Sequence, residues 1–152
     1  MEKNLASPDF RVKITPEDVQ RMTDHAGTYY VHNKIEGFSN EIIALTVVHS
    51  TSRFGRQSTN FSHIPTGGRT AGTKFKYTTG AFSPFDYWYV EGHVDFGPGM
   101  ATFRTKDNFY CSVAASDDGN VDLILTSYRL DGSPRSLQVE FSDSSGCETM
   151  FV

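Results

Sequence analysis

From Thr28 onward, apolar residues alternate with polar ones, which is the pattern of strands that bury one face. Residues two apart on a strand point to the same side of a sheet. The runs EIIALTVVHS, TKFKY, NFYCSV, NVDLILTSY and SLQVEF all show this alternation. The residues expected to face the core are Ile43, Leu45, Val47, Phe75, Phe109, Cys111, Val113, Val121, Leu123, Leu125, Leu137, Val139 and Phe141.

Turn-forming residues separate these runs, in GFSN, PTGG, DFGPG, DDGN and DGSPR. Gly, Pro, Asn and Asp end strands and supply the backbone conformations of turns. Many short strands with regular turns are typical of an all-β sandwich or barrel. The sequence therefore predicts an antiparallel β-sandwich.

One segment, ITPEDVQRMTDHAG, has a helical pattern instead. Thr15 can cap a helix, Pro16 suits the first helical position, and the apolar residues that follow share one face. We expect a short N-terminal α-helix over about residues 16–26. It would lie in an extension of residues 1–27, with the sandwich domain at 28–152.

The stretch GAFSPFDYWYVEGH, residues 80–93, holds five aromatic residues, among them the only tryptophan. The two-residue period assigns Trp88 to the core face, with Val90, Gly92, Val94 and Phe96. The opposite face would carry Tyr87, Tyr89, Glu91, His93 and Asp95. Phe82 and Phe85 precede the strand and are expected in a loop.

These aromatic residues suggest two kinds of binding surface. Phe82 and Phe85, beside Pro84, suit contact with a lipid interface; the alternative is a loop folded over an open end of the sandwich. The Tyr87 and Tyr89 face suits a carbohydrate, because phenol rings offer flat apolar area and carboxylates accept hydrogen bonds from hydroxyls. It would equally suit an ordinary strand surface, where tyrosine is common.

Length and charge narrow the function classes. A chain of 152 residues fits one domain. The net charge is −4 and the basic residues are scattered, which argues against a nucleic-acid partner. Arg53, Arg56 and Arg69 fall in one stretch, which we interpret as a solvated loop. The opening MEKNLASPDF lacks the apolar core of a secretory signal, so a cytoplasmic location is the default expectation, with unconventional secretion left open.

Catalytic and metal-binding motifs such as GxSxG, HExxH or a phosphate-binding glycine loop do not occur. Glu91 and Asp95 share a strand face, but four residues along a strand span about 13 Å, more than glycosidase carboxylates require. The acidic stretch SDDGNVD lacks the distal Glu of a calcium loop, and Asp118–Gly119 is predicted to be a hairpin turn. We expect no enzyme activity, no metal and no cofactor.

The two cysteines, Cys111 and Cys147, are too few for a disulfide framework and lack CxxC metal spacing. A disulfide between them and a pair of free thiols both stay open. A bridge would stabilise the fold by roughly 3–4 kcal/mol through the lost entropy of the unfolded chain.

The motifs VVHSTS, FSHIPTGG, KYTTG and DYWYV stand in this order between residues 47 and 90. In this order they resemble a family of small domains named for nematode proteins up-regulated in long-lived insulin-receptor mutants. The stretch KDNFYCSVAASDDGNVDLILT extends the resemblance. The N-terminal extension departs from the pattern, as does Phe61, where the family has a tryptophan. The resemblance implies no catalytic residues. The architecture is also similar to that of the actinoporins and aegerolysins, small cytolysins that bind lipids through aromatic loops.

The sequence as a whole predicts a binding module that is not an enzyme. The leading expectation is a lipid or membrane-surface partner, in a defence or toxin role, contacted by Phe82, Phe85, Tyr87 and Tyr89. One alternative is a lectin that binds a glycan on the face of Tyr87, Tyr89, Glu91 and His93. A protein-interaction domain is the other alternative, and a homo-oligomer is left open.

Overall fold

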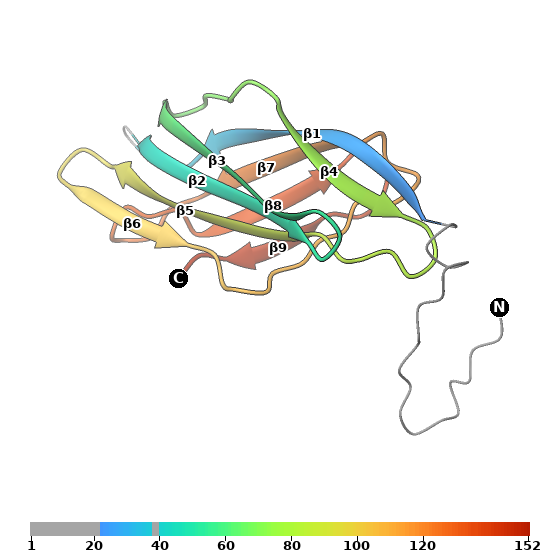
Figure 1. Ribbon diagram of the computed structural model, residues 1–152. Helices are drawn as coiled ribbons and strands as arrows, with labels where there is room; N and C mark the ends of the chain where they lie inside the picture. Colours follow the sequence, from blue (N-terminus) through green and yellow to red (C-terminus); the bar gives the residue numbers. More distant parts are fainter. Residues whose placement is uncertain (1–21, 38–39) are drawn as a thin grey trace.

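The computed structural model describes residues 22–37 and 40–152. Its nine strands form two sheets packed face to face, as the sequence predicts (Figure 1). The larger sheet has the strand order β4 (Thr73–Thr79), β1 (Thr23–Lys34), β7 (Asn120–Thr126), β8 (Ser136–Phe141), β9 (Cys147–Met150). The smaller sheet has the order β3 (Gly55–Ile64), β2 (Glu41–Thr51), β5 (Tyr87–Asp95), β6 (Met100–Arg104).

One strand pair departs from the predicted antiparallel arrangement. β1 and β7 run parallel inside the larger sheet, with Val31 opposite Leu123. The strand before β7 in the chain is β6, which lies in the other sheet, so the chain crosses between sheets before it enters β7. The prediction of a hairpin at Asp118–Gly119 was therefore wrong. The Asp118 carboxylate instead accepts a hydrogen bond from the Asn120 N–H at 2.9 Å, a local turn that starts β7.

The predicted N-terminal helix is wrong over Thr23–Ala26, which belong to β1. The earlier part of that prediction lies outside the described residues. Cross-strand contacts explain the difference: His25 stacks on the Tyr77 ring and its Nε2 lies 2.8 Å from the Thr79 hydroxyl. A short helix has little stability of its own, so pairing with β4 overrides the local preference.

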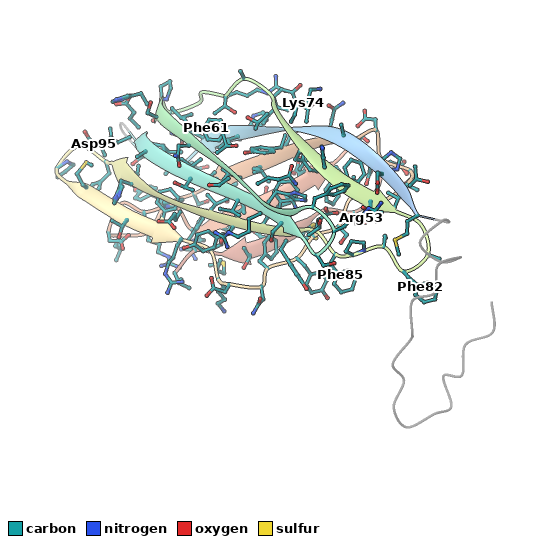
Figure 2. The ribbon with its side chains drawn as sticks, in the orientation of Figure 1. Arg53, Phe61, Lys74, Phe82, Phe85 and Asp95 are labelled. Atoms are coloured by element: carbon teal, nitrogen blue, oxygen red, sulfur yellow. A yellow bond between two sulfur atoms is a disulfide. The ribbon has the colours of Figure 1, made fainter. Side chains whose placement is uncertain are left out.

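The hydrophobic core fills the space between the two sheets (Figure 2). Trp88 is 1% exposed and meets the rings of Tyr29 and Phe75 with centroids 5.8 and 5.3 Å apart. Most predicted inward residues are buried, namely Leu45, Val47, Phe75, Cys111, Val113, Val121, Leu123, Leu125, Leu137 and Val139. Phe109 and Phe141 are partly buried and pack against this core.

Ile43 is the exception among the predicted core residues. Ile42 pairs with Val94 and Ala44 with His93, so Ile43 is the extra residue of a β-bulge. A bulge shifts the alternation of side chains by one position. Ile42 is therefore fully buried and Ile43 only half-buried.

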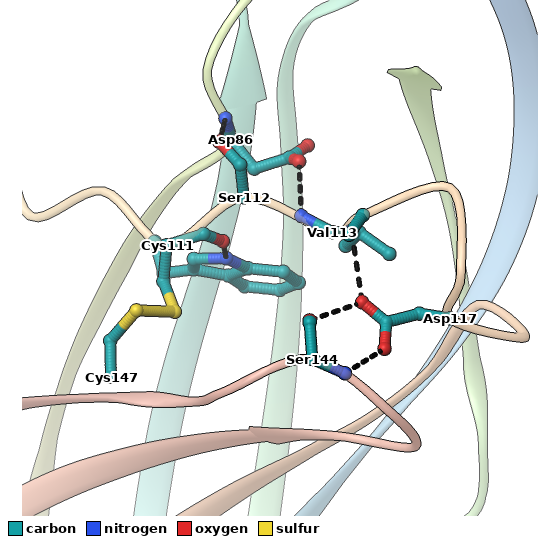
Figure 3. The surroundings of a disulfide bond; sticks show 9 residues. Asp86, Cys111, Ser112, Val113, Asp117, Ser144 and Cys147 are labelled. Carbon is teal, nitrogen blue, oxygen red and sulfur yellow. Dashed lines mark hydrogen bonds between the residues drawn. A yellow bond between two sulfur atoms is a disulfide. The ribbon is translucent and has the colours of Figure 1, made fainter. Parts of the chain in front are cut away.

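A disulfide between Cys111 and Cys147 settles the question that the sequence left open (Figure 3). It ties the irregular segment between β6 and β7, residues 105–119, to the start of β9. The Trp88 indole N–H donates to the Cys111 carbonyl at 2.9 Å, which holds the same segment against β5. Segment 105–119 is thus fixed from two sides.

Asp117 fixes the second half of this segment (Figure 3). Its carboxylate accepts hydrogen bonds from the backbone N–H groups of Ala114, Asp143 and Ser144 and from the Ser144 hydroxyl, at 2.6–2.9 Å. Burial acts to raise the pKa of Asp117, but these hydrogen bonds outweigh it and lower the pKa below its usual 3.8.

We expect the free energy of unfolding to fall as the pH drops below about 4. The lowered pKa means that the folded state favours the charged carboxylate, so this stabilisation is present above pH 3.8 and is lost as the pH falls through the folded-state pKa. The D117N variant should lose about 2 kcal/mol at neutral pH and show a weaker acid dependence. Urea denaturation at several pH values measures both the loss of stability at neutral pH and its acid dependence. D143N, an exposed aspartate of the same turn, is the control; equal behaviour of the two variants would contradict the assignment.

Candidate binding surface

Strand β5 carries most of the predicted site residues, and its two faces are as predicted. Trp88, Val90 and Val94 are buried between the sheets. The outward side chains are Tyr87 and Tyr89, both half-buried, and Glu91 and His93, both exposed. These four side chains form a row along the outer face of the four-stranded sheet.

Three aromatic side chains gather at one end of this row. Phe85 stacks on Tyr110 with ring centroids 5.0 Å apart and planes 13° apart, and Tyr110 meets the edge of Tyr87 at 6.2 Å. Phe85 is 55% and Tyr110 57% exposed. We call Phe85, Tyr87 and Tyr110 the aromatic cluster. It presents apolar ring surface to solvent on the same side as the outer sheet face.

Phe82 does not belong to this cluster. It lies nearer the β4 end of the loop between β4 and β5, apart from Phe85 (Figure 2). It is half-buried, and its φ of +63° is in the left-handed region that non-glycine residues rarely adopt. The loop thus presents one strongly exposed phenylalanine ring instead of two.

Asp86 fixes the chain between the first two members of the cluster (Figure 3). Its carboxylate accepts hydrogen bonds from His49 Nε2 at 2.7 Å and from the Val113 N–H at 2.9 Å. Its backbone N–H donates to the Ser112 hydroxyl, and its carbonyl accepts from the Cys111 N–H. One buried aspartate therefore joins β5, β2 and the segment that carries the third aromatic ring.

His49 is fully buried, with its ring against Trp88 at 4.6 Å and Phe75 at 4.8 Å. The Gln57 side-chain amide lies 3.1 Å from His49 Nδ1, where its NH₂ group can donate. The other ring nitrogen, Nε2, then carries the proton and donates to Asp86. Because both partners are almost inaccessible, this pair supports the surface above it and does not touch a ligand.

Two adjoining hollows lie beside the aromatic cluster, with volumes of about 400 and 350 Å³. They share Ser50 and Tyr87, so Tyr87 stands between them. The larger is lined by Val48, Ser50, Arg56, Tyr87, Trp88, Tyr89, Asp107 and Asn108. The smaller is lined by Ser50, Thr51, Ser52, Pro84, Phe85 and Tyr87. The larger hollow thus combines hydroxyl, amide, carboxylate and guanidinium groups with half-buried tyrosine rings, and the smaller combines hydroxyls with the exposed Phe85 ring.

The pKa of the Tyr89 phenol, which lines the larger hollow, is raised above its usual 10.0. Burial raises its pKa first, and the hydrogen bond to Glu91 and the negative charge of that carboxylate raise it further. The phenol therefore stays a hydrogen-bond donor at neutral pH.

Across residues 22–37 and 40–152, no group of three or more His, Cys, Asp or Glu side chains is placed to hold a metal ion. The same part of the chain contains no helix that is long and apolar enough to cross a membrane.

Several residues of the surface were missed by the sequence analysis, namely Ser50, Arg56, Asp107, Asn108 and Tyr110. Tyr110 carried a signal: in NFYCSV it alternates with the core residues Phe109 and Cys111, so it must point outward. The interpretation of the three arginines as one solvated loop holds in part: all three are exposed, but only Arg53 and Arg69 lie in loops, on either side of β3. Arg56 lies in β3, Arg53 pairs with Asp24 at 2.7 Å, and Arg69 covers the Tyr30 ring at 3.8 Å.

The sequence matches no protein-family profile and no curated protein.

Proposed function

We propose that the protein is a non-catalytic module that binds carbohydrate on the aromatic cluster and the two hollows beside it. One observation carries this proposal: the exposed rings of Phe85 and Tyr110 and the half-buried ring of Tyr87 pack together, and Phe85 and Tyr87 line hollows that also carry polar groups. A sugar ring has apolar C–H faces, which pack on aromatic rings, and hydroxyls, which need hydrogen-bond partners. This surface offers both kinds of contact in one place.

The polar groups of the larger hollow can serve sugar hydroxyls in both directions. The Arg56 guanidinium donates hydrogen bonds, the Asp107 carboxylate accepts them, and the Asn108 amide does either. Asp107 and Asn108 lie on segment 105–119, which the disulfide and Asp86 hold in place. Rigid placement lowers the entropy cost of binding, because few side chains must be ordered.

A lipid surface is the second candidate. Phe85 and Tyr110 are each more than half exposed at one end of the sandwich, which favours it. However, the two rings stack on each other, so each covers one face of the other and less apolar area is left for insertion. The larger hollow beside them also has a mainly polar lining, with Arg56, Asp107 and Asn108. We therefore place carbohydrate first.

The disulfide bears on the compartment. Disulfides persist in oxidising environments and are rare in the cytosol. The Cys111–Cys147 bond therefore counts against the cytoplasmic default and in favour of the alternative of secretion. A carbohydrate ligand outside the cell is in keeping with that alternative.

A glycan array probed with the labelled protein tests the proposed function. We expect the wild-type protein to bind at least one glycan, and the Y87A and Y110A variants to bind it about tenfold more weakly, because each removes an aromatic contact. Y128A is the matched control, since Tyr128 is an exposed tyrosine (46%) in the loop between β7 and β8. Circular dichroism confirms that each variant is folded.

Two results would contradict the proposal. One is an array with no signal above background at high protein concentration. The other is wild-type binding by folded Y87A and Y110A. Co-sedimentation with liposomes is run in parallel on the wild type and on F85A. If the wild type binds vesicles, F85A does not, and the array shows no signal, the result favours a lipid surface as the ligand instead of carbohydrate.

A further inference from the structure

The binding surface continues along β5, beyond the aromatic cluster. Two smaller hollows, of about 170 and 150 Å³, flank Glu91 and His93. The first opens toward β6 and includes Thr102 and Arg104; the second opens toward β2 and β3 and includes Thr46 and Asn60. Two hollows thus lie beside the aromatic cluster and two more lie on either side of Glu91 and His93, farther along β5 on the same face.

The neighbouring strands explain why this face is hollowed. Opposite the large side chains of β5, the outward residues of β2 and β3 are short, in the rows Val48–Ser58, Thr46–Asn60 and Ala44–Ser62. They form a low strip of the sheet face, bounded on one side by the row of β5 side chains. The seven residues of β2 from Ala44 to Ser50 give it a length of about 20 Å. That length accommodates several sugar rings in a line.

The β3 side of this strip is polar. Asn60 is exposed, and its side-chain oxygen accepts a hydrogen bond from the Thr46 hydroxyl at 2.8 Å. This bond orients the amide, so the Asn60 NH₂ group is available to donate to a ligand. Ser58 and Ser62 are exposed on either side of it along β3. Hydroxyl and amide groups thus recur at every second residue, which suits a ligand with repeated hydroxyls.

The charges on this face balance. Arg56 and Asp107 line the same hollow near the aromatic cluster, and Glu91 stands opposite Arg104 across β5 and β6. A polyanion would meet Asp107 and Glu91 along its path, and a polycation would meet the two arginines. An uncharged chain is repelled neither by the carboxylates nor by the arginines.

We infer that the ligand is an uncharged, linear oligosaccharide that lies along β5 from Tyr87 to His93, and not a single terminal sugar. This inference rests on the proposed function, since it extends the same site. The aromatic cluster holds one end of the chain, and the hollows at Glu91 and His93 hold the other.

Chain-length dependence tests the inference. Calorimetric titration compares disaccharides with hexasaccharides of the cello-, chito-, laminari- and malto- series. We expect one hexasaccharide to bind about tenfold more tightly than its disaccharide. H93A and N60A should remove that gain and leave disaccharide binding unchanged, whereas Y87A weakens both. H63A is the matched control, because His63 is an exposed β3 histidine that lines none of these four hollows.

The outcomes separate this inference from the proposed function. Two results would overturn the inference: equal affinity for short and long chains, or a gain in affinity that persists in folded H93A and N60A. Loss of binding in Y87A would still uphold the site at the aromatic cluster. The inference is also overturned, and the site upheld, if the array shows binding only to charged or branched glycans and none of the linear chains above binds. No binding to any glycan overturns both.

Discussion

The double variant C111A/C147A is expected to lose about 4 kcal/mol of free energy of unfolding relative to the oxidised protein. The two cysteines are 36 residues apart, and a bond that closes such a loop removes much of the entropy of the unfolded chain. The loss should be large for a domain of this size, whose total stability is on the order of 5–15 kcal/mol.

Urea denaturation followed by fluorescence measures this loss, because Trp88 is the only tryptophan and donates to the Cys111 carbonyl. Reduction of the wild-type protein should bring its midpoint close to that of the double variant. The double variant itself should not respond to the reductant, which is the control. A difference under about 1 kcal/mol would mean that the bond adds little to the contacts already present.

The D86A variant is expected to be destabilised by about 3 kcal/mol or more. Asp86 is 1% exposed, and its removal leaves two buried donors without an acceptor, the His49 Nε2–H and the Val113 N–H. Each buried donor left unpaired costs roughly 1–3 kcal/mol.

A double-mutant cycle with H49F isolates the pair. In the H49F background the histidine donor is absent, so D86A leaves only the Val113 N–H unpaired and should cost less than in the wild type. Chemical denaturation of the four proteins gives the coupling. Additive losses would show that His49 and Asp86 contribute independently and that the 2.7 Å contact between them adds no stability.

Much of the fold could be predicted from the alternation of apolar and polar residues. Trp88 is buried and Tyr87, Tyr89, Glu91 and His93 point outward, because β5 is regular over its whole length. The alternation misleads at Ile43, since two adjacent isoleucines satisfy it equally and only the pairing of β2 with β5 decides which is the bulge. The helix prediction failed for a related reason. Local preference is weak beside a strand partner that is distant in sequence.

The candidate site was harder to predict because its parts come from separate segments. Phe85 and Tyr87 stand together in the sequence, but Tyr110 comes from segment 105–119. Its alternation with Phe109 and Cys111 indicates that it points outward, but not that it lies beside Phe85. Arg56 and Asp107 converge on one hollow from β3 and from that segment. These two residues come together only because the chain crosses from one sheet to the other, and no local sequence pattern specifies that crossover.

The parallel pairing of β1 with β7 has a consequence for synthesis of the protein. β1 lies between β4 and β7, so Val31 keeps an unpaired backbone edge until Leu123 has been made and has folded back to it. Contacts between residues so distant in sequence form slowly, and open strand edges attract other chains in the meantime. The newly made chain should therefore depend on chaperones until β7 has left the ribosome.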